Sequence, residues 1–147
     1  FNYDIKRSVE LILDIEKELY IDGFDIKLFQ LWSNIIKNAI ESLDQYRDRG
    51  ILKIKASGTE TEIIVQISNN GPMIPEDIKE KIFEKFFTTK ARKNGSGLGL
   101  SIVKSVLDDH AAKMTLESTE EWTTFTFIFK RLSLNPDKKN EVQIELL

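Results

Sequence analysis

Hydrophobic residues recur along the chain with two different periods, and these periods predict its helices and strands. Apolar residues at helical spacing predict one helix from about residue 5 to 19 and a second from about residue 25 to 45. A third helix is expected to start near Pro75, and a fourth to span about residues 97–109. The second helix has a continuous apolar face, made of Leu28, Leu31, Trp32, Ile35, Ala39 and Leu43.

Alternation of apolar and polar residues predicts four strands. Two of them, residues 51–57 and 62–68, are separated by the hairpin-turn residues 58–60. The other two are residues 113–118 and 122–130. Because helices are interspersed with paired strands, we expect an α+β fold. It would be a two-layer α/β sandwich with helices on one face of a mixed, mostly antiparallel sheet.

Size and composition narrow the class of protein. The 147 residues suffice for one domain, which we place at residues 1–134, followed by a polar tail at 135–147. The net charge of −3, without a basic stripe, argues against nucleic acid as a partner. There is no cysteine, and no apolar run approaches the roughly 20 residues that a membrane span needs. The first residue is not methionine, so we expect a fragment of a longer protein.

The second predicted helix carries a polar stripe beside its apolar face. Asn34, Asn38, Glu41 and Gln45 are spaced by four, three and four residues, so they project from one side. A solvated helix face would explain such a stripe in many proteins. Asparagine is a mediocre helix former, however, so two asparagines one turn apart in the middle of a helix have a small cost in stability, which indicates a functional role. Their carboxamide oxygens suit a Mg²⁺ ion held mainly by nucleotide phosphates.

Three further segments are candidates for binding or catalysis. The loop at residues 69–75, NNGPMIP, signals a tight turn after a strand, and a bare turn would also explain it. The run GSGLGL at residues 95–100 opens a helix, where bare backbone N–H groups and the helix dipole attract phosphate. It lacks the lysine of a P-loop and does not follow a strand, as a dinucleotide fingerprint would. Phe83, Phe86 and Phe87 lie at a helical spacing that is often typical of a core.

The combination and order of these segments are more specific than any one of them. LWSNIIKNAIES resembles an N box, SNNGPMIP a first glycine box, KIFEKFFTTK an F box, and GSGLGLSIVKSVLDDH a second glycine box. Residues 24–129 thus resemble the ATP-binding catalytic domain of sensor histidine kinases, in the superfamily shared with gyrase, heat-shock-90 chaperones and mismatch-repair ATPases. The resemblance implies the Bergerat-type ATP-binding fold, with ATP and Mg²⁺ as cofactors.

The resemblance also implies roles for individual residues. The catalytic pair would be Asn38, which coordinates Mg²⁺, and Asn34, which supports it, while Lys37 would meet a phosphate. Asn69 and Thr123 would bind adenine. The other ATP-binding residues that it implies are Gly71, Met73, Lys90, Arg92, Gly95, Ser96, Gly97, Leu98, Gly99 and Leu100.

Two departures from the family pattern concern the chemistry of the site. Hydrolytic members have a glutamate at the position of Asn34, and an amide cannot act as a general base, so we expect phosphoryl transfer rather than hydrolysis. Asn69 stands where the family has an aspartate that accepts a proton from the adenine amino group. An uncharged oxygen is expected to bind that group more weakly.

Other departures concern the framework. Met73 replaces a glycine of the first glycine box, and Ala111 and Ala112 replace two glycines after His110. The short stretch before Asp25 leaves open whether a strand that the family usually carries is present. For His110, the only histidine, we expect a structural role, because a helix C-terminus favours a partly positive ring. The phosphoacceptor is expected on a dimeric helical hairpin that is not in this chain.

We therefore expect the catalytic half of a two-component histidine kinase, which transfers the γ-phosphoryl group of ATP to a histidine on that hairpin. Phe86 and Phe87 would dock the hairpin, the parent would be a homodimer, and a response-regulator receiver domain would be the next acceptor. The domain is expected to be cytoplasmic, and the sequence leaves open whether the parent is anchored in a membrane. Two alternatives remain open: a serine kinase of the anti-sigma-factor type, and a degenerate nucleotide-binding or scaffolding module.

Overall fold

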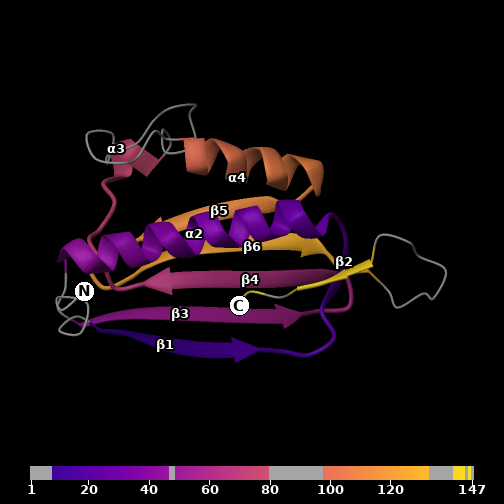
Figure 1. Cartoon of the computed structure of the whole chain (residues 1–147), viewed down its shortest axis with the longest axis horizontal. Helices are drawn as coiled ribbons and strands as arrows, with labels where there is room; N and C mark the ends of the chain where they lie inside the picture. Colours follow the sequence, from indigo (N-terminus) through magenta and orange to yellow (C-terminus); the bar gives the residue numbers. More distant parts are fainter. Residues whose placement is uncertain (1–7, 47–48, 80–97, 133–140, 145, 147) are drawn as a thin grey trace.

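The structure, a computed structural model, describes residues 8–46, 49–79, 98–132, 141–144 and 146. Five strands form one sheet in the order β1-β3-β4-β6-β5, in which only the β1–β3 pair is parallel. Helices α2 and α4 lie on one face of this sheet (Figure 1). The predicted α+β sandwich is therefore confirmed. In chain order the elements are β1 (Ser8–Ile15), β2 (Tyr20–Asp22), α2 (Asp25–Tyr46), β3 (Arg49–Gly58), β4 (Glu62–Asn69), α3 (Glu76–Lys79), α4 (Leu98–Asp109), β5 (Lys113–Ser118), β6 (Thr123–Lys130) and β7 (Glu141–Gln143).

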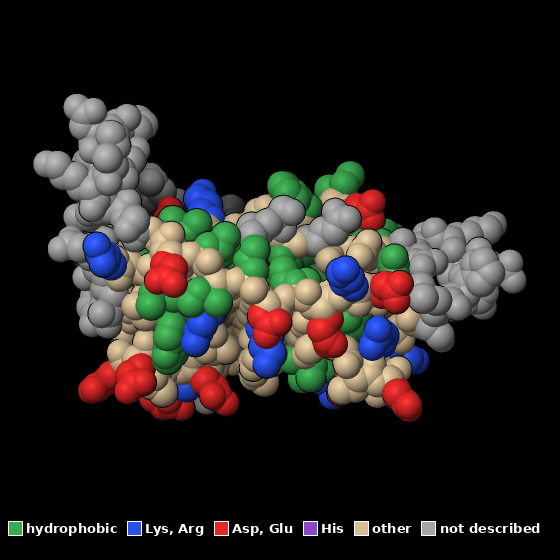
Figure 2. Space-filling view, turned by 90° about the horizontal axis from the view of Figure 1, so that it is seen from below, with side chains coloured by type: hydrophobic (Ala, Val, Ile, Leu, Met, Phe, Trp, Pro, Cys, Tyr) green, Lys and Arg blue, Asp and Glu red, His purple; other side chains and the backbone are tan. Residues whose placement is uncertain are grey.

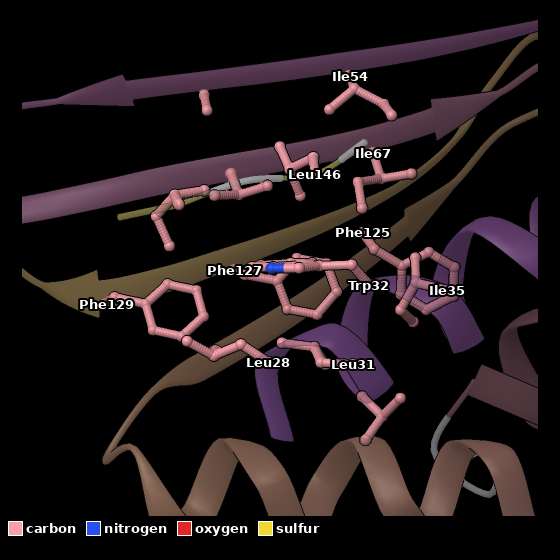
Figure 3. Packing of buried hydrophobic residues seen from close by; sticks show 14 of the residues in the cluster. Leu28, Leu31, Trp32, Ile35, Ile54, Ile67, Phe125, Phe127, Phe129 and Leu146 are labelled. Atoms are coloured by element: carbon pink, nitrogen blue, oxygen red, sulfur yellow. The ribbon is translucent and has the colours of Figure 1, made fainter. Parts of the chain in front are cut away.

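The core lies between the sheet and the two helices, as the hydrophobic periods predict. Every second residue of β3, β4 and β6 is buried on the helix-facing side of the sheet. Trp32 of α2 meets Phe127 and Phe129 of β6 edge to face, with ring centroids 5.4 and 5.8 Å apart (Figure 3). These contacts fix how α2 lies on the sheet, and therefore where its polar stripe lies.

The prediction of a helix from about residue 5 to 19 is wrong, because residues 8–15 form the edge strand β1. The short stretch before Asp25, for which the sequence left a strand open, contains the three-residue strand β2. Parallel pairing of β1 with β3 requires a crossover connection, which β2 and α2 supply. Viewed from the β1 side, hydrophobic side chains lie among acidic and basic ones (Figure 2). The apolar side chains of β1 are between 37 and 48% exposed; they are Val9, Leu11, Ile12, Leu13 and Ile15.

The end of the chain contributes to the fold as well. Residues 141–143, within the segment expected to be a polar tail, form β7 and pair antiparallel with β2. Ile144 and Leu146 are buried in the main core. Most of the polar run at 135–141 lies outside the described residues, and the domain boundary at residue 134 stays a prediction.

One end of the sheet collects the segments that the sequence singles out. There β4 ends at Asn69, β5 ends at Ser118 and β6 begins at Thr123. The same end, on the left in Figure 1, holds the end of α2, the short helix α3 and the start of α4. The candidate site is therefore built at this end, on the helix-facing side of the sheet.

Candidate functional site

Three polar residues form a row across the strand ends. Asn69 of β4 lies opposite Thr123 of β6, and Thr123 lies opposite Ser118 of β5. Asn69 and Thr123 are only 5% and 3% exposed, and they are the two buried polar residues of the described chain. Burying polar groups is costly unless they are hydrogen-bonded, so their partners show how the site is held.

Asn69 is held by the loop that follows it. Its Oδ1 accepts the backbone N–H of Gly71 at 2.8 Å. Because a backbone N–H can only donate, the atom facing it must be the amide oxygen, and this fixes the orientation of the carboxamide. A Cβ on Gly71 would lie 2.8 Å from that oxygen and 3.4 Å from Cβ of Ser42. Glycine therefore lets the loop lie close against α2.

A chain of hydrogen bonds ties the same loop to β5 and β6. The Ile74 N–H donates to Ser118 Oγ at 2.8 Å, and Ser118 Oγ lies 2.6 Å from Thr123 Oγ1. Thr123 Oγ1 also lies 3.4 Å from the Pro72 carbonyl, so its single proton points either to that carbonyl or to Ser118. The sequence analysis identified Thr123 but missed Ser118. The sequence does contain an indication of Ser118. It follows Met114 and Leu116 at alternate positions of β5, so it is a polar residue at the end of an otherwise apolar, helix-facing row.

Asn70 extends the sheet by one residue beyond β4. Its Oδ1 accepts the Ile51 N–H at 2.7 Å, and its own N–H donates to the Ile51 carbonyl at 3.3 Å. Asn70 was not among the predicted site residues. Its role here is to fix the point at which the loop leaves the sheet, directly after Asn69.

The polar stripe of α2 lies where the sequence predicts it. Asn34 and Asn38 are half-buried, whereas Lys37 is exposed. Asn34 Nδ2 donates to the Gln30 carbonyl at 2.8 Å, and because a carbonyl only accepts, the amide oxygen of Asn34 points away from that bond. Within the described residues this oxygen accepts no hydrogen bond. A neutral oxygen that is available in this way fits the outer contacts of a Mg²⁺ ion carried by phosphates.

The structure places only part of the predicted phosphate cradle. Leu98, Gly99 and Leu100 form the first turn of α4, so the helix N-terminus does lie at the same end of the sheet as Asn69. Met73, in the loop after β4, is 49% exposed. The predicted residues Lys90, Arg92, Gly95, Ser96 and Gly97, together with the whole F box, lie outside the described residues.

His110 joins the end of α4 to the start of α2. Its Nε2 accepts the Phe24 N–H at 3.1 Å, and its Nδ1 lies 2.7 Å from the Val106 carbonyl, to which it must donate. This arrangement puts a proton on Nδ1 and leaves Nε2 as an acceptor, and both contacts agree with the structural role expected of His110. The neighbouring Lys27 binds Asp109 at 2.8 Å, and this hydrogen bond lowers the pKa of the Asp109 carboxyl.

The site and the fold define a class of protein. The family described as histidine kinase-, DNA gyrase B-, and HSP90-like ATPase matches residues 23–133. This span includes α2, the loop after β4 and α4. The chain therefore belongs to this family of ATP-binding domains.

Similar proteins include a sensor protein and a histidine kinase. The C4-dicarboxylate transport sensor protein DctB of Rhizobium meliloti (strain 1021) is 32% identical over 109 residues. These cover 74% of this chain but only 17% of DctB. The catalytic domain of the histidine kinase ThkA, in a nucleotide-free form, superimposes with a TM-score of 0.74 at 32% identity, covering 84% of this chain and 79% of that one. The predicted resemblance is thus confirmed.

ThkA has also been solved in complex with the response regulator protein TrrA. That structure matches with a TM-score of 0.69 at 32% identity and covers 84% of this chain and 34% of the kinase chain.

Among the described residues of the present chain, none of the helices is long and apolar enough to cross a membrane.

Proposed function

We propose that this chain binds Mg-ATP at the end of the sheet marked by Asn69 and delivers the γ-phosphoryl group to a histidine on a separate dimerisation domain. The observation that carries the proposal is the joining of three elements at one place. The polar stripe of α2, the loop held by Asn69 and Gly71, and the N-terminus of α4 lie at the same end of the helix-facing side of the sheet.

Each of these elements has a role that its chemistry supports. The buried row of Asn69 and Thr123 would receive the base, and the first turn of α4 would receive phosphate through its free N–H groups and the helix dipole. Asn38 would coordinate a Mg²⁺ ion carried by the triphosphate, with Asn34 supporting it and the exposed Lys37 meeting a phosphate. The ion would neutralise charge on the phosphates during transfer.

Transfer is favoured over hydrolysis by the residue at position 34. The amide nitrogen of Asn34 is bound to the Gln30 carbonyl, and an amide oxygen is too weak a base to activate water. With an amide in place of a carboxylate at position 34, the triphosphate would be held until an acceptor nucleophile arrives in line with it. The acceptor histidine, the homodimeric parent and a response-regulator receiver domain as the next acceptor belong to this proposal, and the ThkA–TrrA complex supports the last of these.

Calorimetric titration with ATP, with and without Mg²⁺, tests the binding half of the proposal. Asn38→Ala should weaken Mg-ATP binding by about tenfold or more, as expected for a lost metal contact worth about 1.5 kcal/mol or more. Ser33→Ala, an exposed position on the same helix, is the matched control and should leave the affinity unchanged. Absence of wild-type binding at millimolar Mg-ATP would refute the proposal and favour the scaffolding alternative.

The transfer half is tested with radiolabelled ATP and the dimerisation domain of the parent added in trans. Label should appear on that domain as an acid-labile phosphate, because phosphohistidine hydrolyses in acid whereas phosphoserine does not. Acid-stable label on a protein substrate would instead support the serine-kinase alternative.

A further inference from the structure

The amide of Asn69 presents a different group at the base subsite from the one that the sequence analysis assumed. Its oxygen faces the Gly71 N–H at 2.8 Å, so its nitrogen faces the opposite way. Within the described residues Nδ2 has no hydrogen-bond partner. No fully buried side-chain nitrogen or oxygen in that part of the chain lacks a partner, so Nδ2 must reach the surface although the residue is only 5% exposed.

The position of this nitrogen makes it a ligand-facing group. Alternation along β4 places the Asn69 side chain on the helix-facing side, beyond Ile67 and opposite Thr123. The single hydroxyl proton of Thr123 is directed to Ser118 Oγ at 2.6 Å or to the Pro72 carbonyl at 3.4 Å. Of the side-chain donors of Asn69 and Thr123, only the unpartnered Nδ2 of Asn69 is therefore available to a ligand.

We propose that the base subsite offers a hydrogen-bond donor, the Asn69 amide nitrogen, to the six-position of a purine, and so accepts a 6-oxopurine nucleotide at least as well as an adenine nucleotide. The inference rests on the proposed function, which places the base at Asn69. The six-position of adenine carries an amino group, which donates, whereas that of hypoxanthine or guanine carries a carbonyl, which accepts. Two donors cannot pair, but an amide N–H and a carbonyl can.

Rotation of the amide would not remove this preference without a cost. Turning the Asn69 carboxamide by half a turn would bring Nδ2 against the N–H of the buried Gly71 and leave that donor without an acceptor. The penalty for an unsatisfied buried donor corresponds to roughly 5- to 150-fold in affinity. An adenine nucleotide would bear that penalty, and a 6-oxopurine nucleotide would not.

The test compares Mg-ATP with Mg-ITP, which differ at the six-position and in the proton on N1. For the wild-type chain, calorimetry should give a dissociation constant for ITP no higher than that for ATP. Asn69→Asp restores a charged acceptor and should shift the ratio of the two constants by about tenfold or more towards ATP. Asn70→Asp is the matched control: it adds the same charge one residue later and should leave the ratio within about twofold.

Two results would overturn the inference while leaving the proposed function intact. One is a wild-type preference for ATP of more than about threefold, which would mean that the second lone pair of Oδ1 reads the amino group. The other is an unchanged ratio in Asn69→Asp. Failure of both nucleotides to bind wild type would instead remove the proposed function, and the inference with it.

Discussion

The His110 contact makes a quantitative prediction about how the two helices are held together. Replacing His110 by alanine removes the acceptor of the Phe24 N–H, a hydrogen bond worth about 1 kcal/mol. It also removes edge-to-face contacts with Phe24 and Phe129, whose ring centroids lie 5.7 and 6.5 Å away, at about 0.5–1.5 kcal/mol each. The Val106 carbonyl keeps the backbone N–H of residue 110 as a partner, so its loss adds little. The total is about 2–4 kcal/mol of unfolding free energy.

Gly23 turns this estimate into a double-mutant cycle. A Cβ at Gly23 would lie 2.6 Å from the His110 ring, and the φ of Gly23 is outside the left-handed region, so Gly23→Ala has a steric cost alone. That cost should be about 1–3 kcal/mol in the wild type and close to zero once the ring is gone. Urea unfolding followed by the fluorescence of the buried Trp32 measures both values.

Two results would refute this account of His110. Additive effects of Gly23→Ala and His110→Ala would show that the two residues are not in contact. A loss below about 0.5 kcal/mol in His110→Ala would show that the ring does not hold the helices. His110→Gln, which can keep an acceptor near the Phe24 N–H, should recover part of the loss.

Two further predictions concern single contacts. Gly71→Ala should weaken Mg-ATP binding about fivefold in calorimetry without lowering the melting temperature much, because its Cβ would displace the Asn69 oxygen; unchanged affinity would contradict the site. The Asp109 carboxyl should titrate below an ordinary aspartate in an NMR pH series, and Lys27→Met should return its pKa towards the usual value. Because the folded pKa of Asp109 is lowered, the stability that its carboxylate contributes is present above the unfolded pKa and is lost as the pH falls through the folded pKa. If Lys27→Met left the Asp109 pKa unaltered, Lys27 would not be the cause of the shift.

The sequence predicts those elements whose hydrophobic period coincides with burial. Helix α2 and strands β3, β4 and β6 each have one face in the core, so their apolar residues recur at the period of the element. In β1 the apolar residues lie on both faces of the strand and stay partly exposed, so they do not alternate with polar residues. Val9 and Ile12 are three residues apart, which is also a helical spacing, and this led to the wrong prediction of a helix. Strand β7 is three residues long, too short to show any period.

Much of the candidate site was also predictable, but the direction of its hydrogen bonds was not. The motifs located Asn34 and Asn38 on one face of a helix, and Asn69 and Thr123 at strand ends, where the structure finds them. Which end of an amide faces the protein depends on a backbone group two residues away in Asn69 and four residues away in Asn34. Only coordinates fix that choice, and it decides whether the side chain offers a donor or an acceptor.

Strand β1 has a consequence for local opening of the domain. It pairs with β3 on one side only, and no helix of the described chain packs closely on it. Few buried apolar contacts oppose its detachment, so its amide protons should exchange with solvent before those of β4 and β6. Each such opening bares the edge of β3, a row of backbone donors and acceptors that another chain could extend. While β1 is in place, Glu10 and Asp14, whose charges flank Ile12 on one face of β1, would repel a second copy of this strand paired antiparallel on Ile12.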